Sequence, residues 1–134
     1  MIASHAVEEF GRVAGLAGLN LQPDGQCALV TAEGTEIGLN TDGRDEDTLV
    51  VSVVQAAPFV TAAQLLVILQ TCDVRTQTII PPVRAALQGS GSEARVIGAL
   101  RLDRVRLTGQ AIASAIEALQ AWQRGWRALC GRND

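Results

Sequence analysis

Aromatic residues and lysine are what this sequence of 134 residues has least of. Aromatic residues make up 3% of it, as two Phe and two Trp with no Tyr. This scarcity disfavours a nucleic-acid-binding module, because such modules stack bases on aromatic side chains. All eleven basic residues are Arg. The absence of Lys excludes a Lys nucleophile, a Schiff base and the lysine of a phosphate-binding P-loop.

Histidine and cysteine are almost as scarce. His5 is the only His, and the three cysteines, Cys27, Cys72 and Cys130, lie far apart with no C-x-x-C motif. The sequence therefore predicts no disulfide framework, no metal site and no cofactor. Ser4 next to His5 does not build a catalytic triad, whose members converge in space from separate segments. We expect no catalytic residue and a protein that is not an enzyme.

Charge also excludes several partners. The formal net charge is −3, which gives no overall attraction to DNA or to an anionic membrane. Residues 1–60 contain nine acids and two Arg, whereas residues 61–134 contain five acids and nine Arg. The densest acidic run, Asp42–Asp47, lacks the spacing of a calcium loop, so a solvated hairpin tip is the better interpretation.

No segment has the pattern of a membrane or export signal. Residues 1–9 carry two acids where a signal peptide needs positive charge, and the central apolar run Leu65–Leu69 is far shorter than a membrane span. We therefore expect a cytoplasmic protein without membrane insertion. A length of 134 residues with 48% hydrophobic content predicts one globular domain over residues 1–134.

The hydrophobic periodicity and the turn residues predict an α-β-β-β-α-β-β-α order. Ser4 is the expected N-cap of the first helix, and Thr61 with Gln64 forms a capping box for the second. The expected helices are 4–14, 61–72 and 108–129, and the expected strands are 26–31, 36–40, 48–54, 83–87 and 94–100. The last helix carries an apolar stripe of Ile112, Ile116, Leu119, Trp122, Trp126 and Leu129. Its two Trp are more typical of a core than of a peptide-binding anchor.

Two elements have more apolar surface than one small domain needs. Strand 48–54 is apolar on both faces, with Val51 and Val53 on one face and Val50 and Val54 on the other. Either another element covers the second face, or that face is exposed for a partner. Helix 61–72 is apolar nearly all round, so it is either central or packed against another subunit.

The Arg101–Arg106 segment supports a different hypothesis. Arg101, Arg104 and Arg106 precede the last helix and are compatible with a small nucleotide- or nucleic-acid-binding regulatory domain. No aromatic residue is interleaved with them, which favours a solvated edge or a surface for an acidic partner.

The sequence resembles class I type III secretion chaperones, the Tir-chaperone or CesT-like family, over nearly its whole length. The segments that carry the resemblance are residues 7–11, Gly15-Leu16, residues 24–30, the turn at Gly34, and the strand 94–107 that leads into the helix of Trp122. The resemblance implies a single α+β domain, with an antiparallel twisted sheet and helices mainly on one face. The irregular segment Asp73–Pro82 departs from the family pattern.

The resemblance also implies a function. Such chaperones are cytosolic homodimers in bacteria that bind the N-terminal segment of one or more effector proteins, keep it competent for secretion and target it to the export apparatus, where the secretion ATPase is a further partner. In the family, the second helix and a neighbouring strand form the dimer interface. The corresponding residues here are Leu65, Leu66, Ile68, Leu69, Val83, Ala85 and Leu87.

The effector is expected on the sheet face opposite Leu29, Val51 and Val53. The candidate effector-binding residues are Ala28, Val30, Val50 and Val54, with Phe10 and Val13 of the first helix as an extension that is equally compatible with the core. The nearby acids Glu33, Glu36 and Asp42–Asp47 form a polar rim that favours cargo with Arg or Lys.

Overall fold

The computed structural model describes residues 2–16, 18–31, 34–42, 45–72 and 82–131, and the side chains of 42, 45 and 46 are not among what it describes. The elements in chain order are α1 (Ile2–Val13), β1 (Gln26–Val30), β2 (Glu36–Asp42), β3 (Asp45–Ala56), α2 (Ala62–Thr71), β4 (Arg84–Gln88), the short 3₁₀ turn η1 (Gly91–Glu93), β5 (Arg95–Leu102) and α3 (Gly109–Gly131). This order confirms the predicted α+β class. The expected irregular segment Asp73–Pro82 lies outside the described residues, apart from Pro82.

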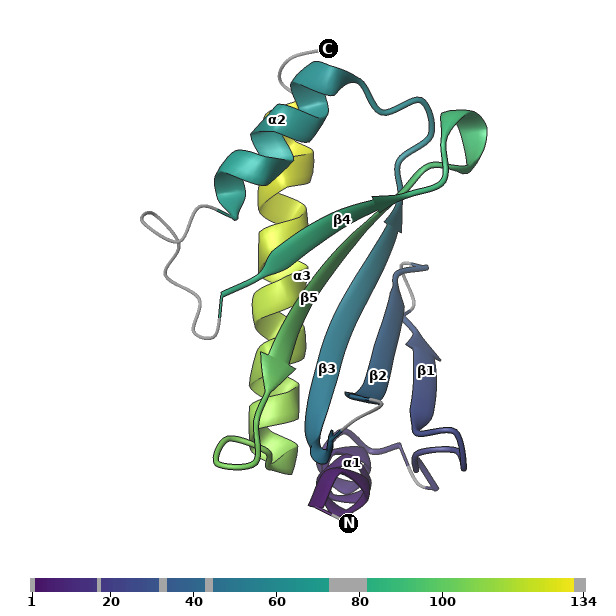
Figure 1. Ribbon diagram of the computed structural model, residues 1–134, viewed down its shortest axis with the longest axis vertical. Helices are drawn as coiled ribbons and strands as arrows, with labels where there is room; N and C mark the ends of the chain where they lie inside the picture. The colour runs from purple at the N-terminus through teal and green to yellow at the C-terminus, as the bar shows by residue number, and fades with distance from the viewer. Residues whose placement is uncertain (1, 17, 32–33, 43–44, 73–81, 132–134) are drawn as a thin grey trace.

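The five strands form one antiparallel sheet in the order β1-β2-β3-β5-β4. β3 is the central and longest strand, and it twists along its length beside α3 (Figure 1). Its register pairs Val53 with Ile37 on one side and with Gly98 on the other. Because side chains alternate along a strand, these pairings put Leu49, Val51 and Val53 on one face.

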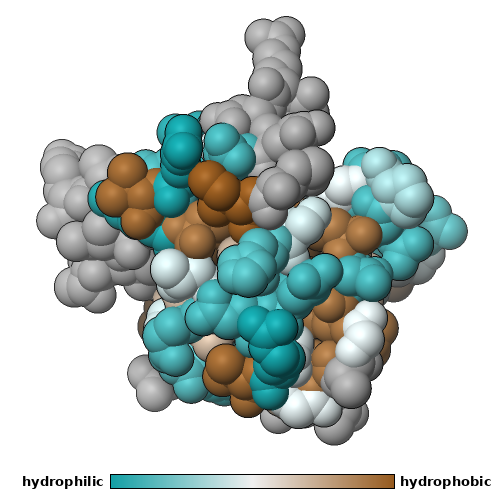
Figure 2. Space-filling model, turned by 90° about the horizontal axis from the view of Figure 1, so that it is seen from below, coloured by the Kyte–Doolittle hydropathy of each residue, from teal (hydrophilic) through white to brown (hydrophobic). Residues whose placement is uncertain are grey.

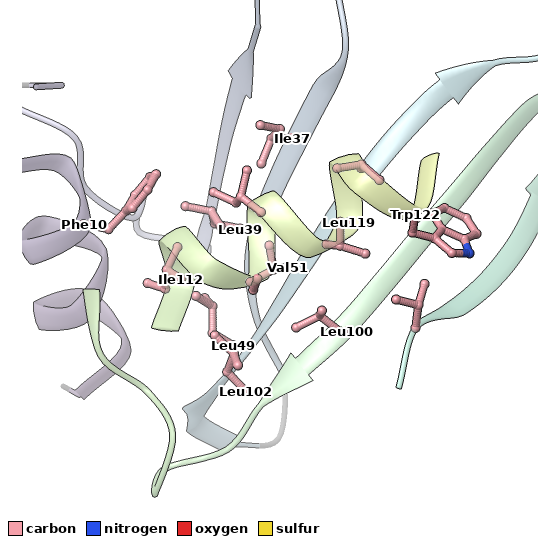
Figure 3. Close-up of a cluster of buried hydrophobic side chains, with 14 of the residues drawn as sticks. Phe10, Ile37, Leu39, Leu49, Val51, Leu100, Leu102, Ile112, Leu119 and Trp122 are labelled. Atoms are coloured by element: carbon pink, nitrogen blue, oxygen red, sulfur yellow. The ribbon is translucent and has the colours of Figure 1, made fainter. Parts of the chain in front are cut away.

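That face is covered by helices and forms the core. α1 and α3 both contact β3, and α1 also contacts α3. Figure 3 shows core side chains from the sheet meeting Ile112, Leu119 and Trp122 of α3 and Phe10 of α1. The fully buried members include Leu39, Leu49, Val51, Val53, Ile112 and Leu119.

The start of α2 follows its predicted capping box. The Gln64 backbone N–H donates to Thr61 Oγ1 at 3.1 Å, and the Thr61 N–H donates to Gln64 Oε1 at 2.9 Å. These two bonds satisfy backbone donors that a helix start otherwise leaves unpaired. The side chain of Thr71, at the other end of α2, accepts from Trp122 Nε1 at 2.8 Å, which fixes α2 against α3.

Two helix predictions were wrong. Ser4 is not an N-cap, because α1 begins at Ile2 and buries Ala3 against the core. Leu129 is exposed, and Cys130 takes its place in the buried stripe of α3. Cys130 lies four residues after Trp126 and therefore stays on the buried face of the helix. Leu129 lies three residues after Trp126, and its side chain is rotated outward.

Candidate functional site

The sheet face opposite α1 and α3, called the open face here, carries the candidate effector-binding residues. The strand register arranges its side chains in three rows that cross the strands. The first row is Val30, Glu36, Val54, Ile97 and Ala86; the second is Ala28, Gly38, Ser52, Ala99 and Arg84; the third is Gln26, Asn40, Val50 and Arg101. The structure thus confirms that Val30, Val50 and Val54 point away from the helices.

The second row forms the floor of a shallow trough across the sheet. Its members on β1, β2, β3 and β5 are small, and the larger side chains of the first and third rows flank them. A Cβ at Gly38 would lie 2.6 Å from Ser52 Oγ, so the Ser52 hydroxyl would have to move. One hollow of this trough is lined by Ala28, Gly38, Asn40, Ser52 and Val54, and a second by Val50, Ala99, Arg84 and Arg101.

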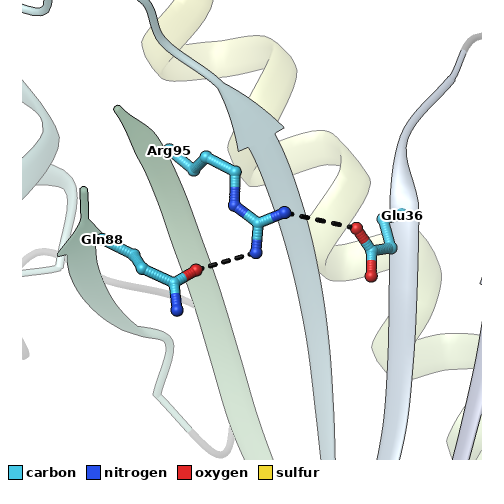
Figure 4. A network of polar contacts seen from close by, with 3 residues as sticks. All are labelled: Glu36, Gln88 and Arg95. Carbon is cyan, nitrogen blue, oxygen red and sulfur yellow. Dashed lines mark hydrogen bonds and ion pairs between the residues drawn. The ribbon is translucent and has the colours of Figure 1, made fainter. Parts of the chain in front are cut away.

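A polar network lies on the open face next to the first row. Arg95 of β5 forms an ion pair with Glu36 of β2, with 3.6 Å between Nη1 and Oε2, and donates from Nη2 to Gln88 Oε1 at 2.7 Å. Figure 4 shows these side chains in front of the strands and α3 behind them. Glu36 is therefore neutralised by Arg95. Of the other predicted rim acids, Asp47 is half-buried, while Glu33 and the side chains of 42, 45 and 46 lie outside the described residues.

The candidate effector-binding residues differ in their exposure and in the face on which they lie. Ala28 and Val30 are exposed, Val30 at 72% of its surface, and Val50 and Val54 are half-buried. Phe10 is 6% exposed. It is a core residue and not part of the cargo surface, because its helical spacing from Ala3 and Val7 places it on the buried side of α1. Val13 is exposed but belongs to α1, which packs on the covered side of the sheet.

The candidate dimer residues also differ in their exposure. Leu66 and Leu69 of α2 are 57% and 59% exposed, and Leu87 of β4 is also exposed. Ile68 and Val83 are only 2% and 1% exposed, because they close the core of the protomer itself. They are therefore corrected from interface to core residues. Leu65 and Ala85 are half-buried.

Several open-face residues were not singled out from the sequence. Ile97 and Ala99 lie there because β5 alternates, with Val96 and Leu100 on the covered face. The same parity argument that sorted β3 would have found them. Arg84 was missed because a five-residue edge strand gives little pattern to read, and its row position depends on pairing with Ala99.

Exposed apolar side chains also occur away from the open face. Phe59, in the turn between β3 and α2, is exposed and has a positive φ of 57°. Val105, in the turn before α3, is 91% exposed. From the end at which α1 lies, hydrophobic residues form several separate areas among hydrophilic ones (Figure 2).

The Arg101–Arg106 segment does not form a nucleic-acid surface with aromatic residues. Arg101 lies on the open face, whereas Arg104 and Arg106 belong to the turn after β5. Both Trp are buried in the core, as predicted. No observation in the described part of the chain favours base stacking beside these arginines.

The described residues do not form a metal-binding site. They contain no group of three His, Cys, Asp or Glu side chains placed to hold an ion. Burial raises the pKa of the Cys27 and Cys72 thiols above the ordinary value of 9.0, although hydrogen bonds with Thr71 and Trp122 partly oppose this for Cys72. No helix within the described ranges is long and apolar enough to cross a membrane.

The chain is similar to solved structures and not to known family or curated sequences. No protein-family model and no curated protein sequence matches the chain. The chain is similar to the Yersinia pestis type III secretion chaperone SycH, solved in complex with a stable fragment of YscM2, with a TM-score of 0.70 and 21% identity over 89% of this chain and 94% of the other.

Two further solved complexes contain similar chains. One is the HopA1–SchA chaperone–effector complex, with a TM-score of 0.71 and 15% identity over 95% of this chain and 94% of the other. The second is the ExsC–ExsE complex, with a TM-score of 0.61 and 15% identity over 90% of each chain. The chain therefore has, over nearly its whole length, the fold of type III secretion chaperones.

Proposed function

We propose that the protein is a chaperone of a type III secretion system in the bacterial cytosol. It binds the N-terminal segment of one or more effector proteins as a homodimer, keeps that segment competent for secretion and delivers it to the export apparatus, including the secretion ATPase. The observation that carries this proposal is the fold, which matches SycH over 94% of the length of that chain. The family resemblance seen in the sequence points the same way.

The open face supports a polypeptide as the ligand. It presents Val30, Val50 and Val54 beside a trough whose floor is made of small side chains. The trough crosses five strands, and four spacings of about 4.8 Å give it a length of about 19 Å. About six residues of extended chain span that length at about 3.3 Å each. Apolar side chains of an effector segment bury these valines, which offsets the entropy that the segment loses on ordering.

The outer face of α2 supports a homodimer. Leu66 and Leu69 are exposed on a short helix whose opposite side already packs on α3. Leu87 adds an exposed apolar side chain on β4, an edge strand of the sheet. A second copy of the chain that covers these leucines removes apolar surface that a monomer leaves in water.

The test is capture and secretion of a specific cargo. The tagged protein is purified from its own bacterium, and retained proteins are identified by mass spectrometry. We expect a protein whose N-terminal segment alone is sufficient for stoichiometric binding and whose secretion stops when the chaperone is deleted. A captured protein that is secreted equally well without the chaperone would contradict the proposal.

A further inference from the structure

The charge of the open face changes along the trough. At the β4 end, Arg84 and Arg101 line the same hollow as Val50 and Ala99. At the β1 end, Asp24 and Glu36 line the other hollow, together with the amide side chains of Gln22 and Gln26. Because Glu36 is paired with Arg95, the trough has a cationic end at Arg84, with an apolar floor, and an anionic end at Asp24, with a polar lining.

Arg84 differs from the neighbouring Arg95 in its partners. Arg95 is held between Glu36 and Gln88. No carboxylate among the described residues forms an ion pair with Arg84, although it lines a hollow and is exposed. Its planar guanidinium can donate two parallel hydrogen bonds to one carboxylate, in bidentate geometry.

We propose that the β4 end of the trough is a subsite for an acidic side chain of the cargo, an Asp or Glu held by Arg84. This inference rests on the proposed function and specifies the cargo that it takes. Because alternate residues of an extended chain point to the same side, the cargo residues two and four positions from the acid lie over the trough floor. Small or β-branched apolar side chains fit there, against Ala99 and Val50.

The anionic end gives the subsite its direction. A second acid about six residues away would lie near Asp24, which disfavours it by like-charge repulsion. Cargo segments with one acid at one end of an alternating apolar stretch are therefore selected over segments with acids at both ends. The Asp24 carboxylate already accepts the Gln26 N–H at 3.1 Å in the turn before β1, which holds it in place.

The experiment uses two labelled peptides, both acetylated and amidated so that only a side chain carries charge. The acidic probe is Val-Thr-Val-Thr-Val-Thr-Glu, and the neutral probe replaces Glu by Gln. Their affinities for the full-length protein are measured by fluorescence anisotropy at low ionic strength. We expect the acidic probe to bind roughly threefold to tenfold more tightly, as for a well-oriented surface ion pair. In Arg84→Gln the two probes should bind equally.

The controls separate this inference from the proposed function. Arg124→Gln removes an exposed Arg on α3 and should keep the preference for the acidic probe. If the wild type binds both probes equally, and Val54→Glu abolishes binding of both, the acidic subsite is wrong while the cargo surface stands. A preference that persists in Arg84→Gln also overturns the subsite. Binding of neither probe, or binding insensitive to Val54→Glu, rejects the trough as cargo surface and the subsite with it.

Discussion

Gly98 illustrates how single residues set the packing of this fold. It lies in the middle of β5, where glycine usually weakens a strand. A Cβ at this position would lie 2.2 Å from the ring of Trp122. The indole of α3 therefore packs directly on the strand backbone. The Trp122 ring also contacts Trp126 edge-on, with 6.1 Å between ring centroids.

Gly98→Val should destabilise the protein. The new side chain forces the buried Trp122 ring or the strand to move, and overpacking of this kind costs about 1–3 kcal/mol or more. Urea unfolding measures the change. The control is Gly125→Ala on α3, where no atom of the described residues outside the adjacent helix backbone lies within 4 Å of the added Cβ. This substitution should raise the free energy of unfolding by up to about 1 kcal/mol. Equal stability of Gly98→Val and the wild type would contradict the packing described.

The cysteine thiols give a prediction about pH. Burial raises the pKa of Cys27 and Cys72, so fewer thiolates exist near pH 8 in the folded protein than in the unfolded chain. Alkylation by iodoacetamide should therefore be slower at both sites in the folded protein than in urea. The protonated thiols contribute their full share to the stability of the folded protein below the ordinary pKa of 9.0. This contribution is lost as the pH rises through the raised pKa of the folded state. Equal alkylation rates in folded and unfolded protein would be evidence against their burial.

At the scale of elements, short-range patterns could be predicted and tertiary contacts could not. The capping box of Thr61 and Gln64 and the two-faced apolar character of β3 follow from spacing alone. The assignment of Ile68 to the core does not, because α2 is apolar on more than one side and only its packing on α3 decides which side is buried. The open-face valines could be predicted, because side chains along a strand alternate between its two faces whatever packs against them.

α2 provides the test of the dimer. Leu69→Asp places a charge on the outer face of α2. Water solvates this charge in a monomer, but a dimer buries it without a partner, which weakens dimerisation by about 3–5 kcal/mol. Light scattering at micromolar protein should show a dimer for the wild type and a monomer for Leu69→Asp, with unchanged far-UV circular dichroism. Ile68→Asp should unfold the protein instead. A wild-type monomer at this concentration, or a dimeric Leu69→Asp variant, would refute the α2 interface.

At the scale of the whole molecule, the sheet separates two roles. Its covered face, with α1 and α3, supplies the core that holds the strands in register. Its open face displays a trough with Arg84 at the β4 end and Asp24 at the β1 end. Leu66 and Leu69, the exposed leucines of α2, line neither hollow of the trough.

The central claim is that cargo binds on the open face. The most direct test compares Val54→Glu, on the trough wall, with Val105→Glu, which places the same charge on a turn where the valine is 91% exposed. Binding of the captured cargo's N-terminal segment is measured by isothermal titration calorimetry, with melting curves of both variants. We expect Val54→Glu to stay folded and dimeric but to bind the cargo at least about tenfold more weakly, which corresponds to a loss of about 1.4 kcal/mol of binding free energy. Val105→Glu should bind like the wild type. A folded Val54→Glu variant with unchanged affinity would contradict it.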